Sequence, residues 1–206
     1  FLPLAFTANG EVEGQVVFAG YGLSVPGNEG KGYDSYAGVD VKDKIVLALH
    51  HVPEKVDMKR HLELTRYGGL RYKAMLARER GAKAFLVVIG PKSPGAGELM
   101  PLSSDKASAN SGITVASIHG KVAEALFAGS GKNLETIQSG LDEENPQIEG
   151  SFDLPNVRVK IATAVEQVKE TDRNILGFLP AGEGMEGAEY IIVGAHYDHI
   201  GHGGVD

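Results

Sequence analysis

The sequence predicts an α/β fold, and one strand–helix–strand pattern with its flanking apolar runs carries that prediction. Residues 44–49 and 84–89 are short, continuous apolar runs, which suit strands buried on both faces. Between them, residues 70–80 carry apolar side chains at helical spacing, and Gly81 is a plausible stop signal. This order and spacing predict a βαβ unit.

Further elements surround this unit. The predicted strands are residues 15–20 and 113–118, and the predicted helical segments are residues 122–128 and 134–139. Residues 50–69 are polar and charged and predict a long loop, or a loop with a poor helix. The acidic stretch 141–149 is expected to be exposed, with the Glu143–Glu144 pair solvated. The predicted core includes Val16, Val46, Leu47, Phe85 and Val87.

The pattern changes after Asn156. In residues 157–163 apolar and polar side chains alternate, which marks a strand with one wet face. Two more apolar runs follow at residues 174–179 and 190–195. These three strands look like the opening of a second sheet. We therefore expect a first domain over residues 1–154 and a second over residues 155–206.

Bulk composition limits the classes of partner. The formal net charge of −7 argues against nucleic acid or an anionic membrane as the main partner. Cysteine is absent, which removes disulfides and thiolate metal sites. No apolar run reaches about 18 residues, so no membrane span is expected. The chain starts at Phe1 without Met, so we expect a processed or excised piece that has lost a signal peptide upstream.

The segment from His196 to Asp206 holds three of the seven histidines and follows an apolar run. If the strand continues, His196 and Asp198 point the same way. An aspartate there could accept a hydrogen bond from one nitrogen of a neighbouring imidazole and leave the other nitrogen for a metal. Ligands bind beyond the carboxyl ends of strands in open α/β sheets, which is where this segment would lie. The pattern favours a metal site at this position.

Two other interpretations stay open for the same segment. A single His-x-Asp pair occurs often by chance, and His199 and His202 could be exposed loop residues. Alternatively, His196, His199 and His202 together could bind adventitious metal as a histidine-rich tail.

Residues 174–182 and 189–201 closely resemble the start of the catalytic domain of co-catalytic zinc aminopeptidases, metallopeptidase family twenty-eight. The specific motif is Gly-Ala-His-Tyr-Asp-His-Ile-Gly at residues 194–201. The resemblance implies that His196 is a zinc ligand and that Asp198 orients this histidine without binding the metal itself. It implies a parent enzyme that removes N-terminal residues from peptides with two zinc ions. It also favours a periplasmic or secreted location.

Residues 16–22, 33–47 and 73–84 resemble the protease-associated domain, which is placed before or within the catalytic domain of many such peptidases. This resemblance implies a sheet or barrel-like core with flanking helices, followed by the opening strands of the zinc-peptidase sheet. It also implies a role in restricting access to the active site or contacting substrates and partners. The segment 50–69 is the best candidate surface, and a solvated loop is the alternative.

Most of the family's catalytic set has no match in this chain. Its bridging aspartate, glutamate pair, later carboxylate and final histidine all come after the His-x-Asp strand. Asp206 lacks the flanking context of the bridging residue, and Glu143–Glu144 stands before the strand rather than after it. Catalytic zinc normally takes three protein ligands, so His196 and Asp198 alone should not hold zinc tightly. We therefore expect the chain alone to be catalytically inactive.

Overall fold

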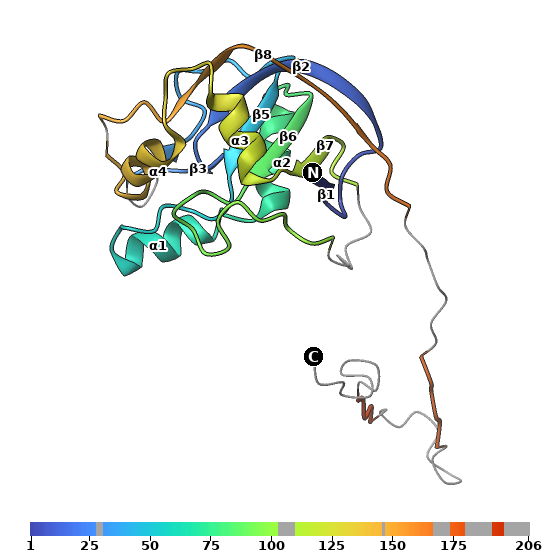
Figure 1. The fold of residues 1–206 in the computed structure, drawn as a ribbon. Helices are drawn as coiled ribbons and strands as arrows, with labels where there is room; N and C mark the ends of the chain where they lie inside the picture. The colour runs from blue at the N-terminus through green and yellow to red at the C-terminus, as the bar shows by residue number, and fades with distance from the viewer. Residues whose placement is uncertain (28–30, 103–109, 146, 167–173, 180–190, 196–206) are drawn as a thin grey trace. The chain divides into compact units, whose positions relative to one another are not determined.

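The computed structural model describes residues 1–27, 31–102, 110–145, 147–166, 174–179 and 191–195. They divide between two compact units, Phe1–Gln167 and Val168–Asp206, which are treated separately. The first unit has the predicted α/β class: its described residues form a six-stranded mixed sheet, a two-stranded sheet and four helices (Figure 1).

The main sheet has four parallel strands at its centre and an antiparallel strand at each edge. Its spatial order is β1 (Leu2–Pro3), β7 (Thr114–Ser117), β6 (Ala84–Val88), β5 (Ile45–Leu49), β2 (Gly10–Ala19) and β8 (Ser151–Thr163). The central strands β2, β5, β6 and β7 run parallel, while β1 and β8 run antiparallel to their neighbours. The second sheet is the pair β3 (Ser24–Val25) and β4 (Tyr33–Asp34).

The described helices are α1 (Met58–Thr65), α2 (Leu70–Glu79), α3 (Gly120–Phe127) and α4 (Leu134–Asp142). Side chains of Asp57, His119 and Asn133 accept backbone N–H groups at the starts of α1, α3 and α4, which explains why these helices begin where they do. Strands β5 and β6 flank α2 in sequence and pair in parallel, so the predicted βαβ unit is confirmed. No helix among the described residues is long and apolar enough to cross a membrane.

Each face of the sheet packs against its own helices. Phe18 and Leu47 belong to the face covered by Phe127 of α3 and Ile137 of α4. The alternate side chains pack with α2 on the other face, because successive strand residues point to opposite sides. The five residues predicted for the core are all fully buried. The first unit is therefore a three-layer arrangement with α3 and α4 on one face and α2 on the other (Figure 1).

The prediction that residues 157–163 open a second sheet is wrong. They belong to β8, which pairs with β2 in the first sheet, with Val12 opposite Ile161. The alternation was interpreted correctly as one buried and one wet face. On the wet face, Lys160 forms an ion pair with Glu11 at 2.7 Å. The first compact unit consequently extends to Gln167, past the predicted boundary at residue 154.

The second unit is described only over residues 174–179 and 191–195, and neither stretch is a strand. The prediction of strands there is wrong for these described residues. Leu176 and Ile192 are largely exposed. A strand is stable only when it is paired within a sheet, and neither stretch belongs to a sheet of the described residues.

Candidate ligand-binding site at the carboxyl end of the sheet

The parallel strands deliver several polar side chains to one edge of the sheet. The residues directly after β2, β5 and β7 include Tyr21, His50 and His119. Because parallel strands end at the same edge, these positions share it. This is where ligands bind in open α/β sheets, in the crevice outside the strand ends.

The connection that follows β6 packs against helices on both faces of the sheet. After β6, Met100 and Ile113 pack into the cluster that contains α2. After β7, the chain enters α3, whose Ala123 and Phe127 pack on the other face. The first part of the connection after β6 therefore lies beside α3 and α4, and its later part lies beside α2.

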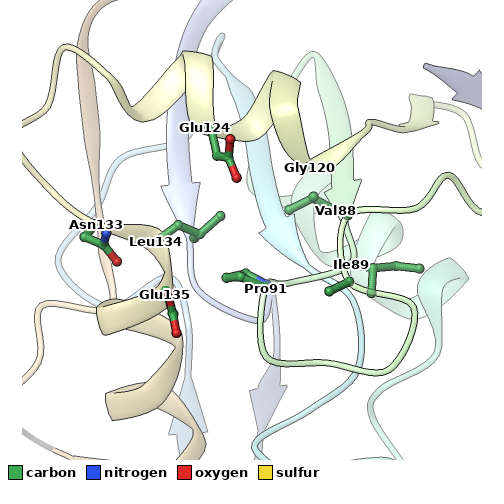
Figure 2. Close-up of a pocket in the computed structure, with 10 residues that line it drawn as sticks. Val88, Ile89, Pro91, Gly120, Glu124, Asn133, Leu134 and Glu135 are labelled. Atoms are coloured by element: carbon green, nitrogen blue, oxygen red, sulfur yellow. The ribbon is translucent and has the colours of Figure 1, made fainter.

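A pocket of about 310 Å³ lies between the loop after β6 and helices α3 and α4 (Figure 2). Its apolar lining comes from Val88 and Ile89 at the end of β6 and from Leu134 at the start of α4. Its charged lining comes from Glu124 on α3 and Glu135 on α4. The pocket therefore combines an apolar floor with carboxylates from two helices.

A glycine pair forms one wall of the pocket. The Gly120 amide donates to the Gly97 carbonyl at 2.8 Å, and the Gly97 amide donates to the Ile89 carbonyl at 3.0 Å. A Cβ at Gly120 would lie 2.7 Å from the Gly97 Cα, so a side chain there would force the backbones apart. Gly97 has φ +74°, which glycine adopts without strain. This close approach holds the loop after β6 against the start of α3.

Gln138 fixes the same loop from beneath. Its side chain is fully buried, its Oε1 accepts the Lys92 amide at 3.0 Å, and its Nε2 donates to Ser93 Oγ at 2.9 Å. Gly90 leaves the space for this, because a Cβ there would lie 2.4 Å from Gln138 Oε1. The loop is therefore tied to α4 as well as to α3, which gives the pocket rigid walls.

Lys73 of α2 is a fully buried cation near the end of β5. Its Nζ donates to the carbonyls of Leu49 at 3.2 Å and His51 at 2.5 Å. Burial lowers the pKa of Lys73 to about 7. His51 has φ +48°, so the lysine secures a turn with a rarely populated backbone conformation. Burial, with the neighbouring His51 and Lys73, lowers the pKa of His50 to about 4.

Tyr21 and Asp142 form a second buried polar contact at this edge. The Tyr21 hydroxyl donates to the Asp142 carboxylate, and both side chains are buried. Burial and this carboxylate raise the pKa of Tyr21 above its ordinary value, so it stays a neutral donor. The contact joins the end of β2 to α4.

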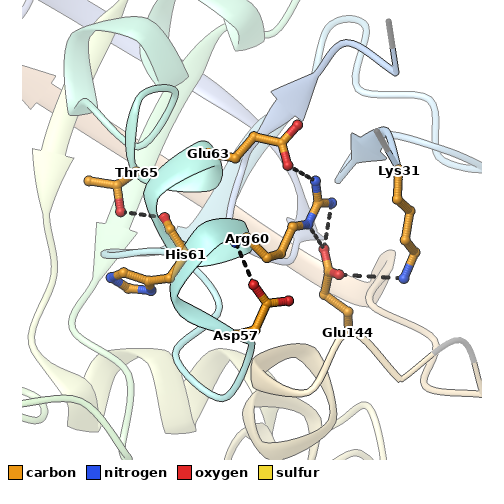
Figure 3. Close-up of polar contacts among 7 residues, drawn as sticks. All are labelled: Lys31, Asp57, Arg60, His61, Glu63, Thr65 and Glu144. Atoms are coloured by element: carbon orange, nitrogen blue, oxygen red, sulfur yellow. Dashed lines mark hydrogen bonds and ion pairs between the residues drawn. The ribbon is translucent and has the colours of Figure 1, made fainter. Parts of the chain in front are cut away.

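Of the two structures predicted for segment 50–69, the structure has the loop with a helix, because residues 58–65 form α1 (Figure 3). Arg60 holds this helix down. Its Nε and Nη2 donate to Glu144 Oε1 at 3.1 and 2.7 Å, and its Nη1 donates to Glu63 Oε2 at 2.7 Å. Lys31 Nζ lies 3.4 Å from Glu144 Oε2. The prediction that Glu144 is solvated is therefore wrong: only 10% of its side chain is exposed.

The predicted metal-site residues His196 and Asp198 lie outside the described residues, as do His199 and His202. Within the described part of the chain, no group of three or more His, Cys, Asp or Glu side chains is placed to hold a metal ion.

Sequence reasoning missed Lys73, Glu124 and Glu135. A signal for Lys73 was present, because it stands three residues after Leu70 and four before Ala77 on the buried stripe of α2. No comparable signal marked Glu124 or Glu135, which come together only because α3 and α4 start on either side of the pocket.

No protein-family model and no curated protein sequence matches this chain. Among solved structures, the chain is similar to an aminopeptidase from Aneurinibacillus sp. strain AM-1, with a TM-score of 0.40 and 19% sequence identity. The similarity covers 62% of this chain and 24% of that chain, so this chain spans about a quarter of the length of that aminopeptidase.

Proposed function

We propose that this chain comprises the protease-associated region and the first part of the catalytic region of a zinc-dependent aminopeptidase. The observation that supports the proposal is the segment 194–201, which resembles the zinc-ligand strand of that family. The earlier segments 16–22, 33–47 and 73–84 support it, because they stand in the order expected for a preceding protease-associated domain. The separate hydrophobic core of the first compact unit is compatible with such a module.

In this proposal, His196 is a zinc ligand and Asp198 orients its imidazole by a hydrogen bond. The aspartate would fix the tautomer that leaves the other ring nitrogen for the metal. The bound zinc ions would polarise the scissile carbonyl and supply a hydroxide equivalent. The 206-residue chain by itself would be inactive, because one histidine does not complete a catalytic zinc site.

The test compares His196→Ala with His202→Ala in the protein encoded by the complete reading frame. We expect His196→Ala to lower chelator-sensitive hydrolysis of amino-acid anilides by at least about 100-fold, because it removes a first ligand. His202→Ala is the matched control and should retain activity. Equal loss in both variants, or full activity in His196→Ala, would contradict the assignment. Chelator-sensitive activity of the 206-residue chain alone would contradict its proposed incompleteness.

A second candidate function, a substrate-gating or interaction surface, is favoured by the outer face of α1. Met58 and Leu62 are one helical turn apart, with 74% and 57% of their surfaces exposed. Exposed apolar side chains grouped in this way often mark contact sites. Lys59 and Arg66 lie beside them and are also exposed.

Gating predicts that a Met58→Ser, Leu62→Ser double variant of the parent enzyme changes its preference for peptide length. These substitutions spare Arg60 and Leu64, which are buried and hold α1 in place. The measurement is the ratio of kcat/KM for a dipeptide and a long peptide. Val122→Ser, at an exposed position of α3, is the control. An unchanged ratio would argue for a solvated surface without this role.

A further inference from the structure

In the described part of the chain, one carboxylate of the pocket between α3, α4 and the loop after β6 has no ion-pair partner. Glu135 is paired with Lys92, whose Nζ lies 3.1 Å from Glu135 Oε1. Glu124 forms no ion pair or hydrogen bond with another described residue. Figure 2 shows its carboxylate directed from α3 toward the pocket. The lining therefore carries a solvent-exposed carboxylate that has no ion-pair partner among the described residues.

The backbone at the start of α3 does not offset this charge by offering donors to an anion. The Gly120 amide donates to the Gly97 carbonyl, and the Lys121 amide donates to His119 Nδ1. The Val122 amide donates to the His119 carbonyl at 2.8 Å. The amides that would cradle an anion at a helix start are thus already used. At α4, Glu135 itself occupies the first turn.

The floor beneath Glu124 is apolar and rigid. Val88 is fully buried in β6, and Leu134 is buried at the start of α4. A volume of about 310 Å³ is near the lower limit of roughly 300–1,000 Å³ for small-molecule sites. It suits one short aliphatic group with a single polar end.

We propose that this pocket binds an aliphatic ammonium, with the alkyl group against Val88, Ile89 and Leu134 and the cation at Glu124. Binding would remove apolar surface from water and pair the free carboxylate at the rim. The same chemistry is offered by a free aliphatic amine and by the ammonium end of a peptide that begins with an aliphatic residue. For a free amine and for a peptide N-terminus alike, the pocket would select a positive charge and a short alkyl group.

The first experiment titrates the 206-residue chain with isoamylammonium, isoamyl alcohol and isovalerate, which share an alkyl group and differ in charge. Chemical shifts of backbone amides report binding residue by residue. We expect saturable shifts at Gly97, Gly120 and Leu134 with the ammonium, at an affinity on the order of millimolar for so small a ligand. The alcohol should bind at least about fivefold more weakly, and the carboxylate should not bind. Leucinamide and the tripeptide Leu-Gly-Gly then distinguish a peptide end from a free amine.

The second experiment uses matched glutamate variants. Glu124→Gln should weaken ammonium binding at least about fivefold and leave alcohol binding unchanged, because it removes charge while keeping shape. Glu79→Gln, on the exposed surface of α2, is the control and should bind like the parent chain. Lys92→Gln should strengthen ammonium binding, because it frees Glu135.

Three results would overturn the proposal. Equal binding of alcohol and ammonium would mean that the pocket does not select charge. Tighter binding of isovalerate would mean that α4 provides an anion site instead. Absence of saturable shifts, with the variants folded by circular dichroism, would mean that the pocket does not take this ligand.

Discussion

Arg60→Met is expected to lower the free energy of unfolding of the first compact unit by about 3 kcal/mol, because it leaves Glu144 without its main partner in a nearly buried position. Only 9% of the Arg60 side chain and 10% of the Glu144 side chain are exposed. Lys31 remains near Glu144 and limits the loss. Methionine keeps the apolar stem of the side chain, so the change reports mainly on the charge. The measurement is equilibrium unfolding in urea, followed by circular dichroism.

A double-mutant cycle and a surface control make this expectation specific. Glu144→Gln should lower the free energy of unfolding less in the Arg60→Met background than in the parent chain, because Glu144 has already lost its ion-pair partner there. The control is Arg158→Met, which breaks an ion pair with Glu13 whose side chains are 67% and 53% exposed. Its cost should stay below about 1 kcal/mol. Similar losses in Arg60→Met and Arg158→Met would show that the α1 contact is no stronger than a surface pair.

Raising the pH from 7 to 9 is expected to stabilise the parent chain relative to a Lys73→Met variant, with a slope of up to about 1.4 kcal/mol per pH unit. Burial lowers the pKa of Lys73 to about 7, whereas an unfolded lysine has a pKa near 10.5. Between these values the unfolded chain binds a proton that the folded chain has released. The free energy of unfolding therefore rises with pH across this window. Below pH 7 both states are protonated and the contribution is constant.

The neighbouring titratable groups do not interfere in this window. The pKa of His50 is lowered to about 4, so its protonation changes the free energy of unfolding only at acidic pH. The pKa of His51 is lowered as well. Tyr21, whose ring lies 5.8 Å from Lys73 Nζ, has a raised pKa and stays neutral. Urea unfolding at several pH values, with Lys59→Met as an exposed lysine control, measures the slope. Parallel pH profiles for the parent chain and Lys73→Met would contradict the prediction.

The central sheet was predictable because the sequences of its strands are continuously apolar. Residues 44–49 and 84–89 are apolar on both faces, and only an interior position in a covered sheet satisfies them. By contrast, the alternation in residues 157–163 predicts a strand with one exposed and one buried face, but it does not predict which strand pairs with it. The pairing partner carries complementary charges far away in sequence, because Glu11 and Glu13 form ion pairs with Lys160 and Arg158.

The contact that anchors α1 and the pocket were not predictable for a related reason. The α1 segment is polar, and Arg60 fastens it to Glu144 through a contact 84 positions away in sequence. The pocket depends on the close approach of Gly97 and Gly120, two glycines in different connections. Neither contact produces a pattern in the local sequence, because each joins residues that are far apart along the chain. The zinc-ligand role of His196 stays a prediction, because that residue lies outside the described part of the chain.

The pairing of β2 with β8 has a consequence for biosynthesis. β2 leaves the ribosome well before β8, which pairs along its outer edge from Gly10 to Ala19 and is synthesised only after β5, β6 and β7. Until then, the nascent sheet carries an open edge, a template for unwanted association between chains. Closing a sheet over so long a separation also slows folding. The interval before β8 emerges is therefore when the growing polypeptide has most need of chaperone protection.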